Sequence, residues 1–114
     1  MIFGQSVVVI RAGERESRAG DIVADWSPSA VTRRLIEGVS VQPNFQNEDT
    51  DAGGITRSTG YRVLTAPGAT PDIRSTDRIE YRGEVHVVSG EVAFWPDPHG
   101  ADHIELTMTA WKGA

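Results

Sequence analysis

The chain contains no cysteine, and this absence excludes disulfide scaffolds, thiol nucleophiles and zinc sites built on cysteine. Long apolar runs are also missing, because the longest, residues 7–10, is far too short to span a bilayer. The first residues show no basic segment followed by an apolar stretch, which is the pattern of a signal peptide. The sequence therefore predicts a soluble chain that is not exported and has no contact with a membrane.

Positive charge is scarce and dispersed. Eleven Lys and Arg residues stand against 16 Asp and Glu residues, which gives a formal net charge of -5 at pH 7. Lys112 is the single lysine, and Arg33 and Arg34 are the one adjacent pair of arginines. Non-specific affinity for nucleic acid comes mainly from cationic side chains that displace condensed counterions. A broad nucleic-acid-binding surface is therefore disfavoured.

The size and composition are those of a small globular protein. A chain of 114 residues with 39% hydrophobic and 24% charged residues fits one domain, so we expect residues 1–114 to fold as a single unit. The mean hydropathy of -0.30 argues against wholesale disorder.

Alternation of apolar and polar residues predicts strands almost throughout the chain. Turn signals recur about every 8–12 residues, as in small β-barrels and sandwiches. We therefore predict an all-β fold, a small β-barrel or sandwich of roughly seven short strands. The expected strands lie within residues 2–11, 21–26, 35–41, 57–65, 77–88, 91–95 and 103–111, and residues 77–88 are expected to form a hairpin with a tight turn at Arg82–Gly83.

Four local signals set the expected ends of these strands. Ala12–Gly13 predicts a turn after the first strand, and Pro43 is expected to end the strand that contains Gly38, a candidate bulge. Ser89–Gly90 is expected to separate two strands. Residues 14–32 have no sustained period and predict a long excursion from the fold.

The segment 44–56 differs in composition from its surroundings. It holds three acids and the pair Gly53–Gly54, and Phe45 is its one large aromatic residue. Such a segment buries too little apolar surface to offset its ordering entropy. We predict an exposed acidic loop at the tip of a long hairpin.

No motif in the sequence indicates catalysis. His99 and His103 stand near Asp97 and Asp102, but two histidines at this spacing share a face only on a helix, and the prolines around Asp97 oppose one. A nucleophile elbow and a phosphate-binding loop are both missing from the sequence. We expect a protein that is not an enzyme and that holds no cofactor and no metal.

Four aromatic residues are expected to pack in the core or at the ends of the barrel, because a base-stacking site would need a basic groove. They are Tyr81, Phe94, Trp95 and Trp111.

The ordered set of these features resembles the head-to-tail connector family of long-tailed bacteriophages, in particular the small stopper, or head-closure, proteins of phages of actinobacteria. The resemblance covers nearly the full chain. It is carried by residues 7–11, 38–43, 47–51, 60–68, 76–85, 88–91 and the stretch from Trp95 to residues 103–106.

The resemblance implies a homo-oligomeric ring, expected to be a hexamer, in the neck of the virion after assembly in the host cytoplasm. It implies portal-adaptor proteins on the head side of the ring and a tail terminator or tail tube on the other side. A long hairpin loop would project into the channel and retain packaged DNA by steric contact. Mapped onto this chain, the channel loop comprises Asn44, Phe45, Gln46, Asn47, Glu48, Asp49, Thr50, Asp51, Gly53 and Gly54.

Two alternatives stay open at this point. A tail terminator or completion ring would share most of these features. An OB-like oligonucleotide-binding module is permitted by the small barrel pattern, but the net charge of -5 counts against it.

Overall fold

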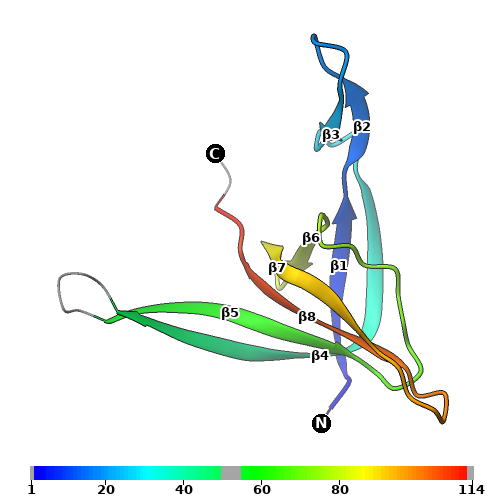
Figure 1. The fold of residues 1–114 in the computed structure, drawn as a ribbon, viewed down its shortest axis with the longest axis vertical. Coiled ribbons are helices and arrows are strands. Elements are labelled where there is room, and N and C mark those ends of the chain that lie inside the picture. The colour runs from blue at the N-terminus through cyan, green and yellow to red at the C-terminus, as the bar shows by residue number, and fades with distance from the viewer. Residues whose placement is uncertain (1, 50–54, 113–114) are drawn as a thin grey trace.

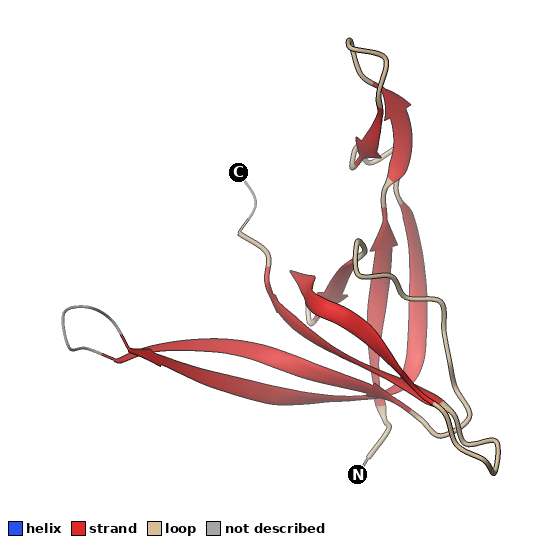
Figure 2. Cartoon of the chain, viewed as in Figure 1, coloured by secondary structure: helices blue, strands red, loops and turns tan. Residues whose placement is uncertain are grey.

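A computed structural model describes residues 2–49 and 55–112. Within these ranges the chain forms eight β-strands and no helix, so the predicted all-β class is confirmed (Figures 1 and 2). No helix capable of crossing a membrane therefore occurs among the described residues. The strands are β1 (Gln5–Arg11), β2 (Gly13–Glu16), β3 (Ile22–Asp25), β4 (Thr32–Asp49), β5 (Ile55–Thr65), β6 (Arg78–Tyr81), β7 (Glu84–Trp95) and β8 (His103–Ala110).

Six of these strands close an antiparallel barrel in the order β1-β4-β5-β8-β7-β6, and β2 pairs with β3 in a separate sheet. The barrel core consists of alternate residues along the strands. On β8, for example, Ile104, Leu106 and Met108 are buried while the residues between them are partly exposed. Burying a side chain of this size stabilises a fold by about 1.5–3 kcal/mol. The fully buried residues of the core include Val7, Val39, Val63, Ile79 and Met108.

The aromatic residues divide between the core and the surface. Tyr81 is buried at 8% exposure, as predicted. Phe94, Trp95 and Trp111 are not core residues, because they are 57%, 51% and 42% exposed. Phe94 and Trp95 lie at the far end of β7, beyond the part of the strand that pairs with β6, so no core surrounds them.

The turn between β6 and β7 forms where the sequence predicts it. Arg82 and Gly83 both have positive φ, at 52° and 79°. A two-residue hairpin of this type matches the twist of the flanking strands and favours glycine at the second position.

Pro43 does not end its strand, contrary to the prediction. Gly38, with φ of 70°, forms the expected bulge opposite Gln5, and β4 then continues to Asp49. The N–H of Val41 donates to Gln5 Oε1 at 2.8 Å, on the edge away from β5. The nitrogen of Pro43 faces the same edge two residues later, where the pairing of β4 with β1 has already ended. No neighbouring strand there requires a hydrogen bond from an N–H, so proline is tolerated within β4.

Two more predicted breaks are absent. Only Ala12 separates β1 from β2, so the turn expected at Ala12–Gly13 does not form. β7 runs through Ser89–Gly90 with a shift of register between Ser89 and Ala93. A bulge absorbs the extra residues there without ending the strand.

The excursion predicted over residues 14–32 is an arm. β2 and β3 form a hairpin that continues the line of β1 and β4 away from the barrel (Figure 1). The predicted strand at 21–26 is confirmed as β3. A second projection, formed by β4 and β5, leaves the barrel in a different direction (Figure 1).

Candidate assembly surfaces

The predicted channel loop lies at the tip of the ribbon formed by β4 and β5. Residues 44–49 belong to β4 and residues 55 and 56 to β5, so the boundaries 44–56 predicted for the loop are wrong. The two strands pair from Val39–Thr65 out to Asp49–Ile55. Of the predicted channel residues, Thr50, Asp51, Gly53 and Gly54 lie outside the described residues.

The outer part of the ribbon is joined to the barrel only through its base. β5 pairs with β8 from Gly60 to Leu64, and β1 pairs with β4 up to Val39. Beyond Asn44 and Gly60, five successive residue pairs connect β4 and β5 to each other. At about 3.4 Å per residue these five pairs extend the ribbon by about 17 Å. The projection is therefore a regularly paired β-hairpin that places the acidic segment away from the barrel.

A set of side chains fixes the base of the ribbon to the rest of the barrel. The amide of Gln5 donates to the hydroxyl of Tyr81 at 2.7 Å and accepts from the N–H of Val41 at 2.8 Å. The rings of Tyr61 and Tyr81 meet edge to face with centroids 5.2 Å apart. Tyr61 also meets the ring of the buried His86 at 5.5 Å. These contacts connect the ribbon to β1, β6 and β7 and determine its direction.

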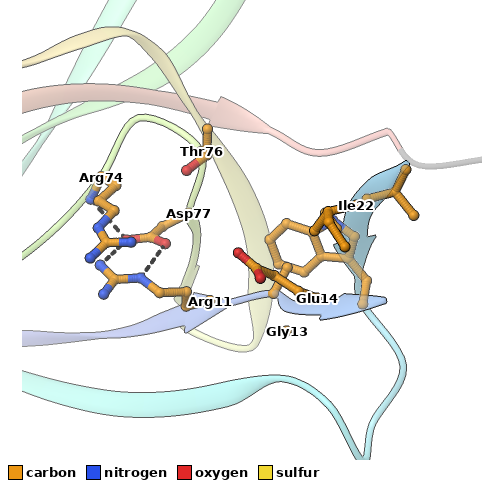
Figure 3. A pocket seen from close by; sticks show the side chains of 11 residues that line it. Arg11, Gly13, Glu14, Ile22, Arg74, Thr76 and Asp77 are labelled. Atoms are coloured by element: carbon orange, nitrogen blue, oxygen red, sulfur yellow. Dashed lines mark hydrogen bonds and ion pairs between the residues drawn. The ribbon is translucent and has the colours of Figure 1, made fainter. Parts of the chain in front are cut away.

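At the base of the arm, β1 is tied to the segment that precedes β6. The guanidinium of Arg11 donates to both carboxylate oxygens of the buried Asp77 at 2.9 Å and to Asp72 Oδ2 at 3.0 Å. Asp77 also accepts from the N–H of Arg74 at 2.8 Å (Figure 3). The hydrogen bond from Arg11 lowers the pKa of Asp72. The charges of Arg11 and Asp77 are fully engaged, so this network serves as a structural joint.

The cavity beside this joint has a volume of about 280 Å³. It lies between the arm and the segment before β6, and Gly13, Glu14 and Ile22 line its arm side (Figure 3). Its two central ionic side chains, those of Arg11 and Asp77, already bind each other. The strongest charges in the cavity are therefore already engaged with each other.

A second joint at the arm uses aromatic rings. The guanidinium carbon of Arg78 lies 3.7 Å from the ring centroid of Trp26 and 4.0 Å from that of Trp111. The N–H of Trp111 donates to the carbonyl of Val85 at 3.0 Å, which holds the C-terminal segment against β7. Burial lowers the pKa of Arg78. We call Trp26, Arg78 and Trp111 the clamp.

The turn between β7 and β8 presents the other aromatic surface. The rings of Trp95 and His103 stack with an angle of 10° and centroids 6.4 Å apart. His103 Nε2 lies 3.1 Å from Glu105 Oε2, and Glu105 also binds Arg62. Burial opposes ionisation of Glu105, but the hydrogen bonds from Arg62 and His103 outweigh it and lower its pKa. We call Phe94 and Trp95, with the turn that follows them, the aromatic tip.

The histidines and aspartates near residue 100 have local roles in this turn. Asp102 accepts from the N–H of Asp97 at 2.6 Å, and Asp97 accepts from the N–H of His99 at 2.9 Å. Among residues 2–49 and 55–112, no group of three or more potential ligands is arranged to hold a metal ion.

The aromatic tip and the clamp were both missed by sequence reasoning. A partial signal for the tip was available, because Phe94 and Trp95 are adjacent in the sequence and a strand cannot turn two successive side chains toward one core. The clamp had no such signal, since Trp26, Arg78 and Trp111 are far apart in the chain.

Comparison of the sequence with protein-family models finds no match, and comparison with curated proteins finds none either. Among solved structures, the chain is similar to the phage-like element PBSX protein xkdH from Bacillus subtilis. The TM-score is 0.48, the sequence identity is 14%, and the similarity covers 96% of each chain.

Proposed function

We propose that the chain is a structural protein of a tailed-phage virion, a stopper that forms a ring between the portal with its adaptor and the tail. In this role the ring retains packaged DNA and provides the surface to which the tail attaches. The observation that carries the proposal is the ribbon of β4 and β5, which extends an acidic segment well beyond a closed barrel. The sequence resemblance to connector proteins supports the same role.

The division of the molecule into a barrel and a ribbon suits a ring with a blocked channel. A closed barrel has a packed core and can form a rigid wall when copies stand side by side. The ribbon can reach inward from such a wall, because its outer pairs make no ladder contact with the barrel among the described residues. Copies of the ribbon converging from several subunits would narrow the channel.

The charge of the ribbon segment suits steric closure. Residues 44–56 hold Glu48, Asp49 and Asp51 and no Lys or Arg. Carboxylates in a channel repel the phosphates of DNA and limit its adhesion to the wall. DNA would then be held back by blocked passage and could leave without first breaking ionic contacts.

The proposal is tested by shortening the ribbon. Residues 45–59 are replaced by Asn-Gly, which joins Asn44 to Gly60 through a two-residue turn. The barrel should stay folded, because the removed strand residues pair only with each other. Particles assembled with this variant should lose packaged DNA, measured as the fraction of nuclease-resistant genomes.

A matched variant separates the length of the ribbon from its charge. The changes Glu48→Gln and Asp49→Asn keep all five outer pairs of the ribbon. We expect particles with this variant to retain DNA. Full DNA retention by particles with the shortened ribbon would contradict the proposed stopper function.

A further inference from the structure

We propose that copies of the chain join head to tail, with the aromatic tip of one copy inserted into the pocket beside the clamp of the next. This inference deepens the proposed function and rests on it, because it names the contact from which the ring would be built. The occupant of the pocket is thus a second copy of this chain.

The aromatic tip is an unusual surface for a protein that acts alone. Phe94 is 57% exposed and Trp95 is 51% exposed, at successive positions of β7 whose side chains face opposite sides of the hairpin. Single exposed apolar residues are normal on protein surfaces, but the stacked rings of Trp95 and His103 form a joint aromatic surface, and such surface marks interaction sites. Tryptophan is also among the residues that contribute most energy to interfaces. The tip therefore has the composition of an interface anchor.

The receiving surface is a pocket of about 280 Å³ on the outside of β1 and β6, next to the arm. Its lining is mostly apolar and includes two arginines, Arg33, which is paired with Glu80, and Arg78. The lining includes Ile10, Trp26, Pro28, Val31, Arg78 and Trp111. An aromatic side chain that entered this pocket would meet apolar side chains and two indole rings.

The charges of the two surfaces are complementary. Residues 91–105, which include the aromatic tip, contain four acids and no Lys or Arg; Glu105 is already paired with Arg62, and the other three are Glu91, Asp97 and Asp102. On the pocket side, Arg78 forms no ion pair with any described residue, and the exposed Lys112 adjoins Trp111. The faces of the Arg78 guanidinium are covered by indoles, but its edge can still donate to a carboxylate. The aromatic tip, which carries negative charge, is therefore complementary to the apolar pocket with its positive charge.

The position of the two surfaces requires two different copies. The turn between β7 and β8 precedes β8 and Trp111 follows it, so the length of β8 separates the two surfaces. A contact between two different patches is heterologous, and repetition of such a contact closes a ring when the rotation allows it. A head-to-tail contact is therefore the geometry that a ring of identical subunits needs.

The test exploits the absence of cysteine from the chain. Ala93→Cys places a thiol beside the aromatic tip, and Pro28→Cys places one at the rim of the pocket, both at exposed positions. The double variant, treated with a short bis-maleimide, should give a ladder of cross-linked species up to the full ring. An equimolar mixture of the two single variants should stop at pairs, because each copy then has one thiol.

A second measurement uses substitutions that leave the fold intact. Trp95→Ala should raise the dissociation constant between copies by about tenfold or more, measured by sedimentation, with an unchanged melting temperature. Leu35→Ala is the matched control, because Leu35 is 57% exposed on β4, outside both surfaces. It should leave the dissociation constant unchanged.

The outcomes separate this inference from the proposed function. Rings of the wild-type chain on portal-adaptor complexes, with no ladder from the double variant, would overturn the contact and leave the stopper function standing. A ladder from a chain that ignores portal-adaptor complexes would support the contact and overturn the stopper function. Cross-linking of Pro28→Cys to an adaptor protein in place of a second copy would also overturn the contact.

Discussion

Arg62, Glu105 and His103 form a row of polar contacts on the outer face of the barrel, and Trp95 extends the row by stacking on His103. Arg62 lies on β5, Glu105 lies on β8 and Trp95 lies on β7, so the row connects three strands. Because Glu105 holds His103 and His103 stacks on Trp95, the row also supports the indole ring. At the residue scale, an ion pair thus positions the side chain that we assign to contact between copies.

This row predicts how stability depends on pH. The pKa of Glu105 in the folded chain lies below its ordinary value of 4.5. A carboxyl whose pKa is lowered by folding contributes stability above its unfolded pKa and loses that contribution as the pH falls through the folded value. We expect the free energy of unfolding, measured by urea titration, to be level near neutrality and to fall below about pH 4.5.

Arg62→Gln gives the control for this prediction. This substitution removes a charge that lowers the pKa of Glu105. The free energy of unfolding should therefore fall less steeply than in the wild type between pH 5 and pH 3, which is about the range in which an ordinary glutamate titrates. Asp72 and Asp25 also have lowered pKa values, so some acid dependence should persist. Identical pH profiles for the two proteins would contradict the role given to Arg62.

The arm is the element whose position depends most on a few side chains. Its strands pair only with each other among the described residues, and Trp26 follows directly after β3. The stack of Trp26 on Arg78 connects the end of the arm to β6. An exposed cation–π contact is worth about 0.5–1 kcal/mol, and a desolvated one about 2 kcal/mol or more.

We therefore predict that Trp26→Ala loosens the arm and leaves the barrel intact. Amide exchange of residues 13–25, measured by mass spectrometry, should become several times faster, with little change in β5 and β8. Ile22→Ala is the matched control, because Ile22 is 65% exposed on the same arm and is not one of the three residues of the clamp. Equal exchange in the two variants would show that the clamp does not hold the arm.

Local signals in the sequence were sufficient for some elements and insufficient for others. The Arg82–Gly83 turn and the alternation of β8 depend on neighbouring residues, so both could be predicted. β4 can continue through Pro43 because the edge of β4 that faces away from β5 has no partner strand at that point. The end of the pairing with β1, which is far away in the chain, determines where that edge becomes free. The acidic segment was recognised from composition, but its pairing as a ribbon depends on the register between β4 and β5.

The whole molecule is more extended than its length requires. Its radius of gyration is 16.4 Å, and its principal extents are 48 × 47 × 26 Å. A compact chain of this length would have a radius of gyration of about 13 Å. The difference comes from the ribbon and the arm, which project from the barrel in different directions (Figure 1). A small barrel with two projections and an exposed aromatic tip has the shape of an assembly unit.

The most direct test of the central claim is native mass spectrometry of the chain, alone and after mixing with portal-adaptor complexes from the same particle. We expect a closed set of identical copies, six in number, to bind to the complex. The same spectrum gives the stoichiometry. A chain that stays monomeric and does not bind the complex at any concentration tested would contradict the proposed stopper function.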